Sequence, residues 1–131
     1  MSVESTIRVM QSYWGGGHSD TNMLADDAVF TIMDSGQENH GPEDIARMLK
    51  EFYHGTFEAD FETTNTIIAD GKAVVEGYVV GKHTGEFAGI PATGKDIRVP
   101  LCVIYDLEND KITKGRVYMA LGILFQQLGV R

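Results

Sequence analysis

The stretch GKHTGEFAGIPATGK at residues 81–95, together with YMALGILFQQLG at residues 118–129, decides the fold of this chain. The four glycines and single proline of the first stretch predict a turn-rich loop between two strands. After the loop, residues 97–107 and 112–119 are β-prone runs separated by the turn sequence END. Residues 121–128 fit a short helix that Gly129 stops. The last third of the chain therefore predicts a loop, a hairpin and a helix.

These blocks resemble the SnoaL-like polyketide (ester) cyclases, a branch of the nuclear-transport-factor-like α+β cones. The resemblance is carried by GKHTGEFAGIPATGK, ENDKI and YMALGILFQQLG. It implies a curved, mostly antiparallel sheet wrapped around N-terminal helices, a cystatin-like cone with one pocket. In that family an aspartate precedes the apolar run of the last block, and the matching position here is Ala120. The resemblance thus implies the pocket of an enzyme without its usual acid–base carboxylate.

The first half of the chain predicts helices and one strand. In residues 2–14, Val3, Ile7, Met10 and Trp14 share one stripe of a helix that the glycines at 15–17 end. Residues 20–25 predict a short second helix, residues 28–34 a strand, and SGQENHG a turn. Pro42 then begins a helix that ends near residue 55.

The second half is mainly β-prone. Residues 57–69 and 73–83 are long runs joined by Asp70-Gly71, a strong hairpin turn. Helices followed by hairpin-connected strands indicate a single α+β domain over residues 1–131. Periodicity alone gives only this class, and the cone comes from the resemblance.

Composition argues against several kinds of partner. The 131 residues include 11 Lys and Arg against 19 Asp and Glu, a net charge of −8. Without a basic cluster, neither a nucleic-acid backbone nor an anionic membrane surface is an expected partner. No signal-peptide pattern or apolar span is visible, so we expect a cytoplasmic protein. A single cysteine, Cys102, excludes an internal disulfide.

Three residues are candidates for catalysis. His83 matches a histidine of the family's loop block and could act as acid or base near neutral pH, or it could anchor the loop. Asp34 ends a predicted strand and could face the pocket mouth, or it could serve the turn DSG. Tyr118 shares strand parity with Ala120, so we expect it in the cavity, where a phenol can donate to a developing oxyanion. Packing in the core is its alternative role.

Further residues are candidates for ligand binding. Arg116 shares the parity of Tyr118, and Ala120 itself marks the expected cavity wall. The cone resemblance implies that Trp14 faces the mouth. Phe30 and Phe57, with Phe87, would supply an apolar lining for a small hydrophobic molecule.

Glu76 and Arg98 lie at comparable positions of neighbouring predicted strands. If both face inward, they could pair within the pocket. If both face outward, they belong to a solvated or dimer-forming sheet face. The strand parity stays open at this point.

Neither a metal nor a cofactor is expected. The four histidines, at positions 18, 40, 54 and 83, form no HxH or HxxxH pair. GGGHSD lacks the Lys-Ser/Thr of a P-loop, and no GxGxxG follows a strand.

Three functions follow as hypotheses. The first is cofactor-free cyclase or isomerase-like chemistry on a small carbonyl or polyketide-like compound, with His83 helped by Asp34, Tyr118 or Arg116. The second is a non-catalytic small-molecule binding protein, which Ala120 favours. The third is a module that forms a homodimer, or binds a partner, through a sheet face built from positions 57, 59 and 61 and 75, 77 and 79. We rank them in this order.

Overall fold

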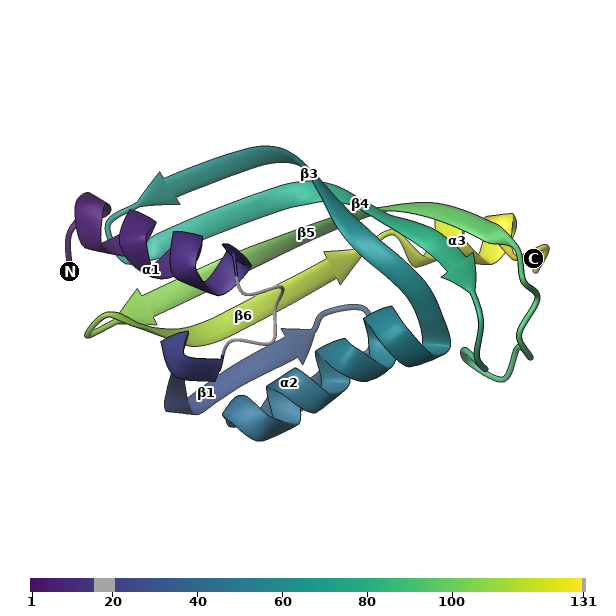
Figure 1. The fold of residues 1–131 in the computed structure, drawn as a ribbon, viewed down its shortest axis with the longest axis horizontal. Helices are drawn as coiled ribbons and strands as arrows, with labels where there is room; N and C mark the ends of the chain where they lie inside the picture. The colour runs from purple at the N-terminus through teal and green to yellow at the C-terminus, as the bar shows by residue number, and fades with distance from the viewer. Residues whose placement is uncertain (16–20, 131) are drawn as a thin grey trace.

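The computed structural model describes residues 1–15 and 21–130, in which helices cover one face of a curved sheet (Figure 1). The helices are α1 (Val3–Gly15), α2 (Pro42–Glu51) and α3 (Leu121–Gln127), with a 3-10 turn η1 (Thr21–Met23) and a π-helical turn η2 (Phe52–Thr56). The strands are β1 (Leu24–Ile32), β2 (Gln37–His40), β3 (Phe57–Ala69), β4 (Lys72–His83), β5 (Asp96–Glu108) and β6 (Lys111–Met119).

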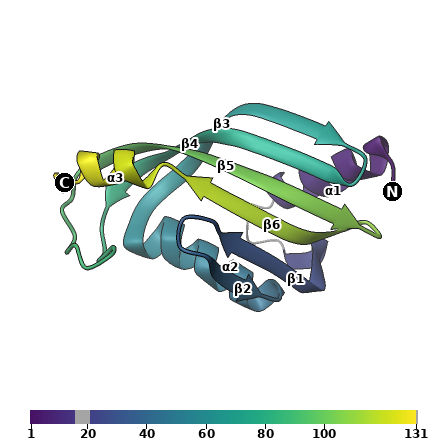
Figure 2. The same ribbon diagram turned by 180° about the vertical axis from the view of Figure 1, so that it is seen from behind.

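The six strands are ordered β2-β1-β6-β5-β4-β3. All neighbours are antiparallel except β1 and β6, which run parallel. The predicted α+β class with a curved, mostly antiparallel sheet is confirmed. We call the face that α1 and α2 cover the concave face, and the opposite face the convex face. Figure 2 shows the convex face from behind, where the described helices leave the central strands uncovered.

The core lies between the concave face and the helices. Along β5 every second residue is buried, from Ile97 and Val99 to Tyr105 and Leu107, while the residues between them face the other side. This alternation is the period of a strand with one face packed on a core. The matching inward residues of β4 include Val75 and Val79.

Glycines in β4 allow β3 to curl tightly across it (Figure 1). A Cβ at Gly77 would lie 2.1 Å from the backbone oxygen of Glu62, and one at Gly81 would lie 2.2 Å from that of Glu58. No side chain fits at such distances, so glycine is required by close approach of the two backbones. A bulge between Thr63 and Asn65 adds to the bend of β3.

The N-terminal helix buries a different stripe from the predicted one. Thr6, Val9, Met10 and Tyr13 are its buried residues, whereas Val3 is 42% exposed. A threonine can lie on this inner face because its hydroxyl donates to the Ser2 carbonyl at 2.6 Å and its oxygen accepts the N–H of a β3–β4 turn glycine at 3.0 Å. These contacts satisfy the buried hydroxyl.

Two segments between α1 and α2 also differ from prediction. The expected helix at 20–25 is the turn η1, and β1 begins already at Leu24. SGQENHG, predicted as a turn, contains β2, which pairs with β1 through Thr31 and Glu38. The predicted helix stop at positions 16 and 17 and helix start at position 20 lie outside the described residues.

The longest of the described helices has 13 residues. A bilayer span needs about 20 apolar residues in a helix. None of the helices described in residues 1–15 and 21–130 could therefore span a membrane.

Candidate functional site

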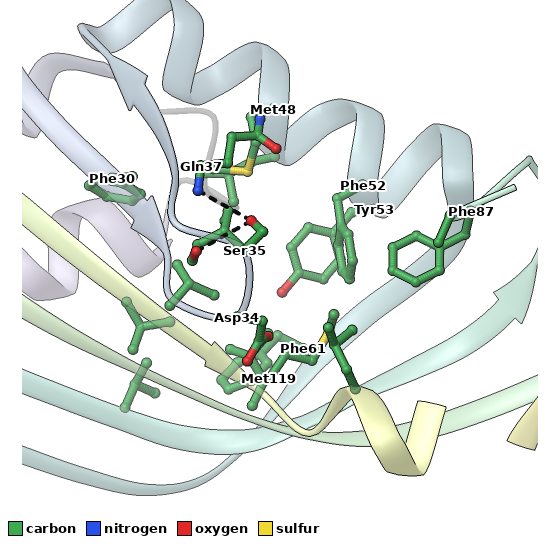
Figure 3. Close-up of a pocket in the computed structure, with 18 of the residues that line it drawn as sticks. Phe30, Asp34, Ser35, Gln37, Met48, Phe52, Tyr53, Phe61, Phe87 and Met119 are labelled. Atoms are coloured by element: carbon green, nitrogen blue, oxygen red, sulfur yellow. Dashed lines mark hydrogen bonds between the residues drawn. The ribbon is translucent and has the colours of Figure 1, made fainter. Parts of the chain in front are cut away.

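A pocket of about 420 Å³ lies between the concave face, α2 and the loop of residues 84–95 (Figure 3). Its volume falls in the range of small-molecule sites. The apolar side chains that line it are Phe30, Ile32, Met48, Leu49, Phe52, Phe61, Val75, Phe87, Ala88, Leu101, Val103, Val117, Met119, Leu121 and Phe125. The polar ones are Tyr13, Asp34, Ser35, Gln37, Tyr53 and Tyr105.

Three tyrosines bring phenol groups to the pocket from three elements: Tyr13 from α1, Tyr53 from η2 and Tyr105 from β5. The rings of Tyr13 and Tyr105 meet edge to face, with centroids 6.0 Å apart. Burial raises the pKa of Tyr105 to about 12, and burial also raises the pKa of Tyr13 and of Tyr53 well above the usual value. These phenols therefore stay protonated and can donate hydrogen bonds. Figure 3 shows the Tyr53 hydroxyl pointing into the pocket.

Asp34 stands at the exposed rim of the pocket, in the turn between β1 and β2. The side-chain contact that closes this turn comes from Ser35, whose Oγ accepts the Gln37 N–H at 3.2 Å. Asp34 makes no side-chain hydrogen bond to another residue in the described parts of the chain. It is also the only charged side chain among the described residues that line the pocket. Its carboxylate is thus available to a ligand.

Four phenylalanines form a continuous wall beside the mouth. Ring centroids are 5.1 Å apart for Phe52 and Phe57, 5.5 Å for Phe57 and Phe87, and 6.0 Å for Phe87 and Phe125. Phe57, predicted to line the pocket, does not reach its surface because Phe52 and Phe87 cover it. Phe30, by contrast, lines the pocket.

The loop block begins with a close approach to η2. The N–H groups of Thr84 and Gly85 both donate to the Thr56 carbonyl, at 3.1 and 2.9 Å. A Cβ at Gly85 would lie 2.7 Å from the Gly55 oxygen, so only glycine permits this contact. The loop then carries Phe87 to the pocket.

The QQLG block fixes α3 to the sheet. The Gln127 side chain accepts the Arg98 N–H and donates to the Arg98 carbonyl, both at 2.8 Å. Lys95 Nζ donates to the Leu128 carbonyl at 3.3 Å. These bonds hold Leu121 and Phe125 of α3 against the pocket.

His83 is fully buried and lies outside the pocket lining. Its Nδ1 accepts the Thr93 N–H at 3.2 Å and lies 3.0 Å from the Thr93 hydroxyl. Its ring packs on Phe57, with centroids 5.4 Å apart. This geometry is that of the loop-anchoring alternative, and no described path leads from the imidazole to a ligand.

The prediction that Tyr118 and Arg116 point into the cavity is wrong. Val117 and Met119 carry the inward parity of β6, so Tyr118 and Arg116 lie on the convex face. The predicted parity was counted from Ala120, which follows the end of β6 and has φ −77° and ψ 76° as the residue before α3. Strand alternation cannot be extended across that break.

Ala120 and Trp14 also differ from expectation. Ala120 is partly buried against the core but does not line the pocket. Trp14 lines a separate cleft between α1, α2 and β3, together with Lys50 and Asp60. The reason is the rotated stripe of α1, which turns Tyr13 rather than Trp14 toward the pocket.

Glu76 and Arg98 both face outward, so they do not form a pair within the pocket. Arg98 instead forms a bidentate pair with Glu62, with both distances 3.2 Å, and its guanidinium carbon lies 4.0 Å from the Tyr78 ring centroid. Glu76 stands opposite Cys102 in the β4–β5 ladder. Positions 57, 59 and 61 and 75, 77 and 79, predicted as an outer face, belong to the concave side.

Within the described ranges, no group of three or more His, Cys, Asp or Glu side chains is placed to hold a metal ion. The polar groups of the pocket are one carboxylate, three phenols, the Ser35 hydroxyl and the Gln37 amide, set against an apolar wall.

A family model described as SnoaL-like polyketide cyclase matches residues 7–128. The chain belongs to the SnoaL-like polyketide cyclase family. No curated protein matches this SnoaL-like chain significantly.

Solved structures share the fold of this SnoaL-like domain. A protein assigned to the SnoaL-like polyketide cyclases from Jannaschia sp. CCS1 matches with a TM-score of 0.80 and 19% identity, covering 98% of this chain and 92% of that one. TsrD from Streptomyces laurentii matches with a TM-score of 0.78 and 20% identity, covering 98% and 97%. A protein of ketosteroid isomerase-like fold from Catenulispora acidiphila, solved with trimethylamine, matches with a TM-score of 0.71 and 17% identity, covering 96% and 93%.

Sequence reasoning missed the three pocket tyrosines. Tyr105 follows Ile97, Val99, Leu101 and Val103 at intervals of two, which is the parity of the buried face. Tyr13 follows Met10 by three residues in α1. For Tyr13 and Tyr105, the spacing that they share with apolar core residues was the available signal.

Proposed function

We propose that this SnoaL-like domain binds a flat, hydrophobic carbonyl compound and moves a proton at the carbon beside that carbonyl. One observation carries the proposal: an unpaired carboxylate, Asp34, and protonated phenols share a mostly apolar pocket. Membership of a polyketide cyclase family and a fold shared with a ketosteroid isomerase-like protein support chemistry of the cyclase or isomerase type.

In the proposed reaction, the Asp34 carboxylate takes the proton and the C–H electron pair moves to the carbonyl oxygen as an enolate. The Tyr53 phenol donates a hydrogen bond to that oxygen, where negative charge develops. The enolate carbon then attacks a second carbonyl to close a ring, and protonated Asp34 returns its proton to the alkoxide that forms. Without ring closure, Asp34 returns the proton at another carbon. His83 and Ala120 transfer no proton in this scheme.

Binding is tested with acetylnaphthalene and with ethylnaphthalene, which has the same ring system but no carbonyl. We expect acetylnaphthalene to bind at least about tenfold more tightly, because buried donors reject a ligand without an acceptor. Tyr53→Phe should remove part of this preference and leave ethylnaphthalene binding unchanged. Equal affinity for both compounds in the wild type would contradict the proposed carbonyl recognition.

Proton transfer is tested with the methyl ester of naphthoylacetate, by following deuterium exchange at its central carbon in D₂O. We expect Asp34→Asn to slow the protein-catalysed exchange by about 100-fold or more. Asp27→Asn is the matched control, since Asp27 is an exposed carboxylate of β1 that does not line the pocket. Equal exchange rates in the wild type and Asp34→Asn would exclude Asp34 as the base.

A binding protein without chemistry is the second candidate, and the alanine at position 120 favours it. In that case acetylnaphthalene binds, but wild-type protein does not accelerate exchange over buffer. The binding measurement and the deuterium-exchange measurement together distinguish an enzyme from a binding protein.

We also propose that a second copy of the chain pairs with the convex face. On this face Arg98 is paired with Glu62 within the chain, and Tyr118 is 41% exposed. Sedimentation at micromolar concentration tests this, and a monomer there would contradict it.

A further inference from the structure

We propose that His83 is a positioning residue that holds the loop of residues 84–95 so that Phe87 stacks on the bound ligand. Through Phe87, His83 would decide how strongly the pocket prefers flat aromatic compounds over saturated ones of similar size. The inference rests on the proposed ligand-binding function and adds a specificity role outside the pocket wall.

His83 closes the base of the loop with both its backbone and its ring. Its N–H donates to the Lys95 carbonyl at 3.0 Å, and its carbonyl accepts the Gly94 N–H at 2.9 Å. The ring Nδ1 accepts the Thr93 N–H at 3.2 Å. Because a backbone N–H can only donate, Nδ1 carries no proton in this arrangement and the neutral ring is protonated at Nε2.

The burial of the other ring nitrogen, Nε2, is not offset by a hydrogen bond to a described residue. Nε2 of His83 is buried and has no hydrogen-bond partner among the described residues. An unpaired buried donor opposes folding. The useful contribution of this histidine therefore lies in the acceptor at Nδ1 and in the packing of its ring.

That packing leads to the pocket in two steps. The His83 ring contacts Phe57, with centroids 5.4 Å apart, and Phe57 contacts Phe87 at 5.5 Å. Phe87 lines the pocket. The backbone bonds of Thr84 to Thr56 and of His83 to Gly94 and Lys95 do not involve the ring, so loss of the Nδ1 contact would release Thr93 between these two fixed ends of the loop.

A shifted Phe87 should matter most for aromatic ligands. Ring stacking adds attraction beyond the burial of apolar area, and it depends on ring position. A saturated ligand of similar size gains from burial alone. Loss of the His83 contact should therefore weaken the binding of aromatic ligands and leave the binding of saturated ligands nearly unchanged.

The test compares His83→Asn, which keeps an acceptor near the Nδ1 position, with His83→Gln, which places its polar group further out. The probes are acetylnaphthalene and its saturated counterpart acetyldecalin. Both variants remove the ring that packs on Phe57, so the difference between them measures the Nδ1 contact. We expect His83→Gln to weaken acetylnaphthalene binding about tenfold and His83→Asn to weaken it clearly less. Acetyldecalin affinity should change less than about threefold in both variants. Equal losses for both probes, or equal effects of the two variants, would overturn the inference.

A double-mutant cycle with Phe87→Leu tests whether His83 acts through Phe87. In the Phe87→Leu background, His83→Gln should have no further effect on acetylnaphthalene binding. A full additional loss would overturn the proposed route.

Hydrogen exchange at the Thr93 amide follows the contact without any ligand. We expect exchange to be faster in His83→Gln than in His83→Asn, and unchanged protection in His83→Gln would overturn the role of Nδ1. If the wild type binds neither probe, the proposed function and the specificity role both fail. The exchange result then still decides whether His83 holds the loop.

Discussion

On β5, neighbouring residues belong to opposite environments. Val103 and Tyr105 point to the concave face, where they are buried and line the pocket, whereas Cys102 and Ile104 point to the convex face. On the concave side the buried polar groups of the pocket include phenols that burial keeps protonated. On the convex side they are ion pairs between strands, such as Asp106 with Arg116 at 2.9 Å.

The difference between the concave and the convex face shows where chemistry can occur in this domain. Arg98 with Glu62 and Arg116 with Asp106 form ion pairs in the partly hydrated surroundings of the convex face, where such pairs add little stability. The concave face contains few polar atoms, and its buried phenols lie in a low-dielectric pocket in which a hydrogen bond counts for more. The charged residues Arg98, Arg116 and Glu76 were therefore poor guides to the pocket, whereas Asp34 does line it.

The largest expected effect comes from the close approach of β3 to the concave side of β4. Gly77→Ala would place Cβ 2.1 Å from the Glu62 oxygen and 2.9 Å from the Phe61 ring. We expect a loss of about 3 kcal/mol or more in the free energy of unfolding, measured with urea, because the backbones must separate.

Gly122→Ala is the control for this change. No atom lies within 4 Å of a Cβ at that α3 position, so we expect a gain of roughly 0.5 to 1 kcal/mol. A mild Gly77→Ala phenotype would show that the sheet can open without cost.

Substitutions at neighbouring positions of β5 should have an intermediate effect on the free energy of unfolding, one that differs between the concave and the convex face. Val103→Thr puts a hydroxyl on the buried face at almost constant volume and should cost about 1 to 3 kcal/mol in urea unfolding. Cys102→Ser makes a similar change on the convex face and should stay within about 0.5 kcal/mol. If Cys102→Ser costs as much as Val103→Thr, the convex face is buried in solution, as a second copy would bury it.

The smallest effect is a pH-dependent one on the convex face. Hydrogen bonds from Arg116, and then from Lys72, hold the pKa of Asp106 at about 2. An unfolded aspartate titrates near pH 3.9, so ionised Asp106 stabilises the fold above about pH 4 and this contribution fades as the pH falls toward 2.

Arg116→Gln should therefore cost about 1 kcal/mol at pH 7 and progressively less below pH 4, measured by urea unfolding at several pH values. The same loss at pH 3 as at pH 7 would mean that Arg116 acts by packing rather than by charge.

Most elements of the fold could be predicted from local signals. The four long strands alternate clearly or carry dense β-branched residues, and Asp70-Gly71 forms the turn between β3 and β4 as predicted. The strand β2 could not be predicted, because QENH contains no strong β-former and its pairing depends on the partner β1. The same holds for Thr6, whose burial depends on a turn 65 residues away.

The candidate site was only partly predictable, because its prediction required the correct face of each strand. The inward face was counted from Ala120, which lies beyond the end of β6. Had it been counted from the apolar set of β5, Arg98 would have been placed outside and Tyr105 inside. Tyr53 needed more than parity, since it depends on the π-helical turn that follows α2.

The docking of α3 through Gln127 has a thermodynamic consequence. A helix of 7 residues has too few turns to persist alone in water, so α3 depends for its order on its bonds to the start of β5. Leu121 and Phe125 of this helix also line the pocket. Binding of any ligand that contacts them is therefore linked by mass action to the folding of α3. Part of the binding free energy is used to order α3, and the bound ligand in turn stabilises this end of the sheet.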